Sequence, residues 1–372
     1  MLHRTVLVGA MGYFVDIYDL VLFGVVRQES LTALGVPADE LLDVGVALLN
    51  WQMAGLLLGG IIWCVLGDKR GRVSVLFGSI LLYSAANLAN AFVTTIPQYA
   101  ALRFVAGVGL AGELGAAITL VSEVLPRDLR GYGAAVVAAV GILGAVFGGI
   151  VGNVLAWQHA YLLGGFLGLG LLAVRYKMRD SGMYASMQRK EVRRGDLRLL
   201  LTGRDRVARY VRCILIGVPL WFVIGILVTF SPELAAELGA TGPILAGTAV
   251  VAAYAGLSVG DLGSGYLSQW VRSRWWVILG FLGLTAALVF VYFFARGLTP
   301  PAFYALCFGL GIGAGYWAVF VTNAAEQFGT NLRATVTTTT PNFVRGSVVP
   351  VTLGFQALAA PLGLARAALA AG

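Results

Sequence analysis

The sequence predicts an all-α protein that crosses a membrane many times, and its composition carries this prediction. Of the 372 residues, 59% are hydrophobic and only 12% are charged, whereas soluble domains are about 45–50% apolar and about 25% charged. Too few charges remain to cover a water-soluble fold of this size, and disordered chains are richer in polar residues. The 50 glycines favour helices that pack closely within a bilayer.

Long apolar runs give the individual spans. A bilayer core about 30 Å thick takes about 20 apolar residues per helix. This length predicts spans at 6–26, 45–66, 73–93, 98–122, 131–152, 157–175, 209–230, 243–268, 275–295, 301–322 and 334–359. The first run lacks a small-residue cleavage site, so we expect a span rather than a signal peptide. Residues 361–372 are apolar but too short to cross, which predicts an incomplete twelfth helix.

Basic residues collect in alternate loops and predict the orientation. The loops around 69–72, 127–130, 177–212, 272–274 and 333 carry most of the Lys and Arg residues. The opposite loops carry only Arg27 and Arg296, together with several acids. Because basic loops resist translocation, we expect a cytoplasmic N-terminus in the inner or plasma membrane. The net charge of +8 then reflects orientation, and no nucleic-acid partner is expected.

One long polar segment divides the chain. The predicted organisation is an N-terminal six-helix bundle at 1–175, a basic cytoplasmic linker at 176–208 and a C-terminal helix bundle at 209–372. The linker could lie along the anionic leaflet or serve only as a tether.

The loop after the second span carries the most specific motif. Its sequence Gly-Asp-Lys-Arg-Gly-Arg at 67–72 resembles the signature loop of the major facilitator superfamily. Cys64 stands where the family pattern has a glycine, although Gly60 could supply close packing one turn earlier. A weaker echo follows the eighth span at 265–274, as a repeated architecture would predict. The segments 103–109 and 123–131 resemble further motifs of the family.

The resemblance implies two pseudo-symmetric six-helix bundles around a central cavity and alternating-access transport of a small solute. It also implies gate residues at the cytoplasmic helix ends: Asp68, Arg72, Glu123, Arg130, Glu326 and Arg333. Ion pairs there could hold the two halves together when the cytoplasmic side is shut. The spacing alone shows charged helix ends, so orientation signals are the alternative interpretation.

Two glycine-rich segments need a separate interpretation. Residues 107–112 satisfy G-x-G-x-x-G, but a dinucleotide site would need a preceding strand. Inside a membrane helix the pattern indicates close helix packing, and the run at 309–315 is interpreted in the same way. The sequence contains no nucleotide-binding loop, no Cys/His cluster and no catalytic cluster. We therefore expect no cofactor, no metal and no enzyme activity.

Four acids lie well inside predicted spans: Asp16, Asp19, Glu113 and Asp261. A charge at the bilayer centre costs at least about 2.5–3.5 kcal/mol, so these acids must face a cavity, find partners or be protonated. Asp16 and Asp19 share one face of the first span, and adjacent carboxylates in a low dielectric favour protonation, as a proton carrier requires. They could instead pair with Arg103 or cap a broken helix. Glu113 could be linked to substrate or protons, or be a structural partner, and Asp261 could be a gate or proton site.

Arg103 and Arg345 are the intramembrane bases that the sequence indicates. Arg345 lies midway along the eleventh span, where its planar fork could bind a carboxylate or phosphate or neutralise an acid of the first half. The predicted substrate- and proton-binding set also includes Gln52, Trp221, Tyr254, Tyr316, Trp317, Asn323 and Asn342. Trp and Tyr could equally form an interfacial belt, but Trp221 is the least belt-like because it lies near the middle of its span.

These features predict a secondary transporter that couples a proton to the symport of a small organic metabolite. The segment Gly-Glu-Leu-Gly at 112–115 resembles part of the family's metabolite–proton symporters. The expected partners are a small-molecule substrate, protons and the lipid bilayer, and the expected state is a monomer. The alternative is a proton-coupled exporter of organic cations or drugs, which the excess of embedded acids over bases favours.

Overall fold

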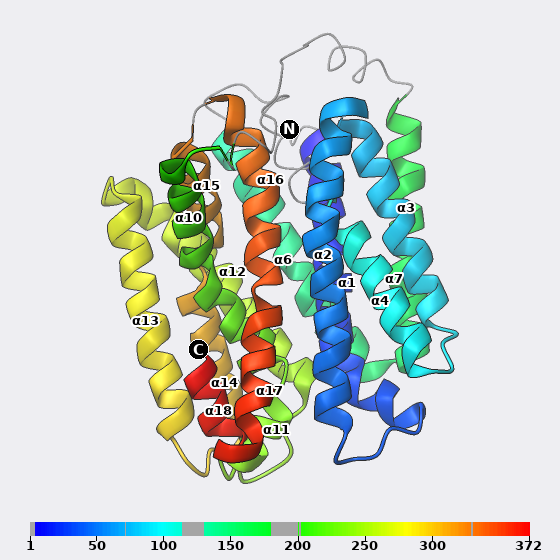
Figure 1. Cartoon of the computed structure of the whole chain (residues 1–372), viewed down its shortest axis with the longest axis vertical. Helices are drawn as coiled ribbons and strands as arrows, with labels where there is room; N and C mark the ends of the chain where they lie inside the picture. Colours follow the sequence, from blue (N-terminus) through cyan, green and yellow to red (C-terminus); the bar gives the residue numbers. More distant parts are fainter. Residues whose placement is uncertain (1–3, 71, 114–129, 180–199, 201, 329) are drawn as a thin grey trace.

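The structure is a computed structural model that describes residues 4–70, 72–113, 130–179, 200, 202–328 and 330–372. All regular secondary structure in these ranges is helical. The helices form two bundles that lie side by side, with the early helices on the right and the later helices on the left of Figure 1. We name the end of the bundles where α1 begins the N-terminal end, and the other the opposite end.

The first bundle contains the helices that correspond to the first six predicted spans. Their bounds are α1 (Arg4–Ala33), α2 (Leu41–Arg70), α3 (Arg72–Asn90), α4 (Ile96–Leu110), α6 (Arg130–Val154) and α7 (Trp157–Arg179). Helix α1 packs against α6 and α7, and α4 packs against α2 and α3. The predicted fourth span is described only as far as Glu113.

The second bundle contains shorter pieces, because three predicted spans are interrupted. Its elements are α10 (Arg204–Phe222), the π-helical turn η2 (Val223–Val228), α11 (Ser231–Glu237), α12 (Ala246–Trp270), α13 (Arg274–Phe294), α14 (Pro300–Ala314), α15 (Trp317–Glu326), α16 (Thr330–Gly346), α17 (Val348–Leu362) and α18 (Leu364–Ala371). The seventh span runs through α10, η2 and α11. The tenth is α14 plus α15, and the eleventh is α16 plus α17. The short helix α18 lies in the stretch where the sequence predicts an incomplete twelfth helix.

Length and composition identify membrane-crossing helices among the described residues. Seven helical stretches are long and apolar enough to cross a membrane. The stretches Ser74–Asn90 and Val140–Val154 are apolar but shorter. The predicted domain boundaries fall partly in 180–199 and 201, which lie outside the described residues, so these boundaries stay a prediction.

Glycines bring α2 and α4 into direct backbone contact. A Cβ atom added to Gly55 would collide with the carbonyl oxygen of Phe104, and one added to Gly107 would collide with that of Gln52. Side chains at these glycines would therefore force the two helices apart. The G-x-G-x-x-G segment is thus a packing surface, as the sequence predicts.

The second bundle repeats this arrangement between α12 and α14. A Cβ atom on Gly256 would collide with the carbonyl oxygen of Phe308, and one on Gly311 would collide with that of Ala253. Glycines on α12 and α14 therefore allow the same backbone contact as the glycines on α2 and α4. This correspondence supports the pseudo-symmetry of the two bundles.

Candidate functional site

An ion pair joins the two bundles midway along α1. Nη1 of Arg345, at the end of α16, lies 3.8 Å from Oδ2 of Asp16, and the two side chains are 1% and 0% exposed. Among the described atoms, neither oxygen of Asp16 and neither Nε nor Nη1 of Arg345 has a hydrogen-bond partner. Buried polar groups are nearly always hydrogen-bonded, so these atoms have the capacity to bind a small polar group.

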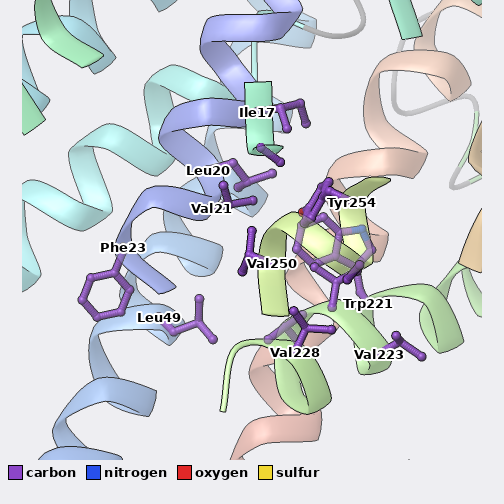
Figure 2. Packing of buried hydrophobic residues seen from close by; sticks show 14 of the residues in the cluster. Ile17, Leu20, Val21, Phe23, Leu49, Trp221, Val223, Val228, Val250 and Tyr254 are labelled. Carbon is purple, nitrogen blue, oxygen red and sulfur yellow. The ribbon is translucent and has the colours of Figure 1, made fainter. Parts of the chain in front are cut away.

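Aromatic side chains surround this pair. The guanidinium carbon of Arg345 lies 5.8 Å from the ring centre of Trp221, whose buried indole nitrogen also has no partner among the described atoms. Tyr254 of α12 and Tyr13 of α1 interact electrostatically with Arg345. Figure 2 shows the rings of Trp221 and Tyr254 beside Val250, across from Leu20 of α1. The site therefore combines a cation, an acid and flat apolar rings.

The second carboxylate of α1 has its partners within the first bundle. Asp19 is buried and interacts electrostatically with Arg103 of α4. Arg103 in turn donates a hydrogen bond of 2.8 Å to Oδ1 of Asn87 and lies 4.8 Å from the ring centre of Tyr161. Asp16 and Asp19 thus have different arginine partners, although they also interact with each other.

Glu113 forms a two-pronged ion pair with Arg175 of α7. Nη1 of Arg175 donates to Oε2 of Glu113 at 3.1 Å, and Nη2 donates to Oε1. Both side chains are buried, and Gly12 of α1 packs so closely that a Cβ atom there would collide with both. Arg175 is not among the predicted residues, because it ends the sixth apolar run and resembles an interfacial residue. The signal that points to it is the requirement of a buried Glu113 for a base.

Asp261 lies at the break in the tenth span. Its Oδ1 accepts a hydrogen bond of 3.2 Å from the backbone nitrogen of Ala318, in the first turn of α15. The break is tight, since a Cβ atom on Gly315 would collide with the backbone of Gly260. A carboxylate in this position satisfies the free N–H groups of a helix start and interacts favourably with its dipole. This geometry supports a capping role for Asp261.

Two predicted polar residues are engaged with the backbone. Nδ2 of Asn342 donates to the carbonyl oxygen of Ala111 in the other bundle at 2.9 Å, and its Cβ lies 3.0 Å from where a side chain on Gly60 would begin. Gln52 donates to the carbonyl oxygen of Leu20 at 3.4 Å, while its own Oε1 has no partner among the described atoms.

The remaining predicted residues lie in or near α15. The hydroxyl of Tyr316 donates to the carbonyl oxygen of Ile216 at 2.9 Å and so ties the break to α10. Trp317 stacks in a tilted arrangement on Phe320, with 5.4 Å between ring centres. Asn323 is half-buried towards the N-terminal end. The predicted residues therefore do not form one site. Buried side-chain atoms without a partner among the described atoms lie at the contact between the bundles, on Asp16 and Arg345, and also within the first bundle, on Asp19 and Arg103.

The predicted gate is described in part. Glu326 forms an ion pair with Arg274, with 2.7 Å between Oε1 and Nη2, and this pair lies within the second bundle. The side chains of the other predicted gate residues lie outside the described residues: Asp68, Arg72, Glu123, Arg130 and Arg333. The gate therefore stays a prediction.

Comparison with known families identifies the fold. The sequence matches the family described as Major Facilitator Superfamily over residues 9–349. The chain belongs to the major facilitator superfamily. A crystal structure of a D-xylose-proton symporter is similar in fold, with a TM-score of 0.69 and 16% sequence identity. The alignment covers 100% of this chain and 97% of the symporter chain. The predicted fold class is thus confirmed, and the chain is a multi-pass membrane protein of the transporter type.

Several curated bacterial transporters are similar to the chain in sequence. A Bacillus subtilis protein named for niacin and nicotinamide transport (NiaP) is 25% identical over 353 residues, which cover 91% of this chain and 84% of that protein. The 4-hydroxybenzoate transporter PcaK of Pseudomonas aeruginosa is 31% identical over 186 residues, which cover 49% of this chain and 41% of that protein. The chain spans about half the length, or less, of several curated relatives that it matches.

Proposed function

We propose that this member of the superfamily imports a small aromatic carboxylate together with a proton. The names of its relatives support the substrate class, because 4-hydroxybenzoate and niacin are both small aromatic acids. The observation that carries the proposal is the ion pair between Asp16 and Arg345, which links the two bundles and has unpartnered polar atoms on both sides.

The chemistry of the pair suits such a substrate. The guanidinium of Arg345 is a planar fork that matches a carboxylate, and its Nε and Nη1 atoms have no hydrogen-bond partner among the described atoms. The ring of Trp221 lies beside it and offers a face for an aromatic substrate. A bound carboxylate would take the place that Asp16 holds in the present structure.

Proton coupling follows from this competition. When a proton neutralises Asp16, Arg345 loses its partner and becomes available to the substrate carboxylate. Substrate binding then favours protonated Asp16 by the same free energy, because coupling between two binding events is reciprocal. Arg345 faces one negative group in the empty and in the fully loaded carrier, none when only the proton is bound and two when only the substrate is bound. Only the empty and fully loaded states would therefore rearrange easily. One monovalent carboxylate and one proton would cross together without net charge.

The alternative, export of organic cations, rests on the excess of embedded acids. In the structure this excess is small, because three of the four acids face arginines: Asp16 faces Arg345, Asp19 faces Arg103 and Glu113 pairs with Arg175. The fourth acid caps α15. An organic cation would therefore have to compete with an arginine or a helix start, so we favour the aromatic carboxylate.

Uptake into proteoliposomes tests the proposal. With an acidic exterior, the purified protein should accumulate labelled 4-hydroxybenzoate, and a protonophore should abolish the accumulation. Excess benzoate should compete, whereas D-xylose should not. Arg345→Lys, which keeps the charge but loses the fork, should strongly reduce uptake. Arg274→Lys is the matched control in an exposed ion pair and should leave uptake unchanged. Accumulation that persists without a proton gradient would overturn the coupling, and inhibition by xylose alone would overturn the substrate class.

The orientation belongs to the same proposal. We infer that the N-terminal end faces the cytoplasm, because basic residues concentrate in the loops at that end. Reporter fusions that are active on only one side of the membrane, placed after residue 37 and after residue 200, test this inference. The second position should report the cytoplasm and the first the exterior.

A further inference from the structure

Asp261 has one carboxylate oxygen that does not take part in the cap of α15. Its Oδ1 accepts the hydrogen bond from the backbone nitrogen of Ala318. Its Oδ2 is buried and has no hydrogen-bond partner among the described atoms, and the residue as a whole is 7% exposed. A carboxylate can accept about four hydrogen bonds, and buried polar atoms are nearly always partnered. Oδ2 therefore has the capacity to accept a hydrogen bond from a bound molecule.

No arginine offsets the charge of this carboxylate. The other three acids inside the spans each face an arginine, whereas Asp261 forms no ion pair among the described residues. The contacts of its carboxylate are backbone N–H groups at the start of α15. A neutral donor such as a hydroxyl can therefore approach Oδ2 without displacing a cation, and hydrogen bonds to an ionised acceptor are about twice as strong as neutral ones.

Tyr13 connects Asp261 with the Asp16–Arg345 pair. It lies one turn before Asp16 on the same face of α1 and is 3% exposed. Its side chain interacts electrostatically with both members of the pair and also with Asp261. One buried phenol ring is thus within electrostatic range of all three groups, which places Asp261 in the neighbourhood of the pair.

Helix α12 gives the direction from the aromatic rings to Asp261. Tyr254 lies two turns before Asp261 on the same face of this helix, and its ring interacts electrostatically with Arg345. Figure 2 shows this ring beside that of Trp221. Seven residues of α-helix rise by about 10 Å, so Asp261 lies further along the same face than the rings that surround Arg345.

We propose that Oδ2 of Asp261 accepts a hydrogen bond from a ring hydroxyl of the transported aromatic acid while Arg345 holds its carboxylate. The inference rests on the proposed function, because it requires a substrate carboxylate at Arg345, and it adds that the site selects hydroxylated acids. Oδ1 then caps α15, and Oδ2 binds the substrate. An acid without the hydroxyl leaves Oδ2 unpartnered, and sites that hydrogen-bond a substrate hydroxyl strongly reject analogues that lack it.

Isothermal titration calorimetry with matched ligands tests the selection. 4-Fluorobenzoate resembles 4-hydroxybenzoate in shape and has the same carboxylate, but its fluorine cannot donate a hydrogen bond. The parent protein should bind 4-hydroxybenzoate about tenfold more tightly than 4-fluorobenzoate, as expected for a hydrogen bond to a charged acceptor. 4-Aminobenzoate, whose amino group can donate, should bind nearly as tightly as 4-hydroxybenzoate.

Asp261→Asn assigns the selection to this residue. The amide oxygen can keep the cap on α15, while the amide NH2 group takes the place of Oδ2 and cannot accept a hydrogen bond. The preference for 4-hydroxybenzoate over 4-fluorobenzoate should fall to about twofold or less. Asp39→Asn makes the same change in an exposed loop and is the matched control, which should keep the parent's preference. If Asp261 acted only through the cap, both Kd values would change by the same factor.

The inference is overturned if the parent binds the hydroxy and fluoro acids equally, or if Asp261→Asn keeps the parent's preference. If Asp261→Asn fails to fold, Asp261→Ser replaces it, because a serine hydroxyl can also cap a helix start but brings no second oxygen. A preference that persists in Asp261→Ser would equally overturn the inference. These outcomes leave the proposed function intact, since both acids still bind. Failure of both acids to bind the parent would instead overturn the proposed function.

Discussion

Replacing Asp16 with Asn should remove the pH dependence of substrate binding. In the structure Asp16 is the charged partner of Arg345, with 3.8 Å between Nη1 and Oδ2. At an effective dielectric constant of about 20, two unit charges at this distance attract by about 4 kcal/mol. The pair lacks a hydrogen bond, and coupling between binding events is typically about 1–3 kcal/mol. We therefore expect Asp16→Asn to tighten binding of 4-hydroxybenzoate at pH 8 by about tenfold to about a hundredfold.

Isothermal titration calorimetry at pH 6 and pH 8 measures this effect. The parent should bind more weakly at the higher pH, because ionised Asp16 then competes for Arg345, whereas Asp16→Asn should bind equally at both. Asp19→Asn is the matched control. It removes the same charge one turn along α1, but Asp19 faces Arg103 rather than Arg345, so binding by this variant should still weaken as the pH rises from 6 to 8.

Transport by the same variants separates binding from coupling. Asp16→Asn should still exchange labelled for unlabelled substrate across a vesicle membrane, but it should no longer accumulate substrate against a gradient. If Asp16→Asn keeps the parent's pH dependence of Kd, then Asp16 does not compete with the substrate carboxylate, and the coupling scheme is wrong.

Three further predictions concern the rings, the helix break and the glycine contacts. Trp221→Ala should weaken binding of 4-hydroxybenzoate about tenfold, because the substrate loses an aromatic face. Trp221→Phe should weaken binding much less. An unchanged Kd by calorimetry would show that the ring does not contact the substrate. Asp261→Ala should lower the free energy of unfolding by about 1 kcal/mol, because α15 loses its cap. Asp261→Asn can still accept the hydrogen bond and should leave stability nearly unchanged. Equal unfolding temperatures for the two variants would contradict the capping role. Gly256→Ala should lower the free energy of unfolding by about 1–3 kcal/mol through overpacking. Gly263 lies on the same helix, but a Cβ atom there meets no atom within 4 Å, so Gly263→Ala should not lower the unfolding temperature. Equal decreases in unfolding temperature would show that the backbone contact is unimportant.

Hydropathy predicts the spans well, because the bilayer demands long apolar helices, and each predicted run contains described helix. It does not predict the interruptions. The tenth span is continuously apolar in sequence, yet it breaks at Gly315 and Tyr316. The break depends on a tertiary contact, since Asp261 from a different span caps the helix that follows. The hydropathy of a single segment contains no information about a partner that lies in another span.

The sequence alone predicts those residues of the candidate site whose type is unusual for their position in a span. Asp16, Arg345 and Trp221 stand out as acid, base and mid-span aromatic, and the structure brings them together. Residues at the ends of runs are harder to recognise. Arg175 looks like an interfacial charge at the end of its run, and only the packing of the helices reveals that it is buried against Glu113.

The backbone contacts at Gly55 and Gly107, with their counterparts in the second bundle, have a mechanical consequence. No compressible layer of side chains separates these paired helices, so neither member can slide or tilt independently of the other. Each pair therefore moves as one unit when the two bundles move relative to each other. Within the described residues, the places where a span can bend are the interruptions of the second bundle, where α10, α14 and α16 end inside their spans.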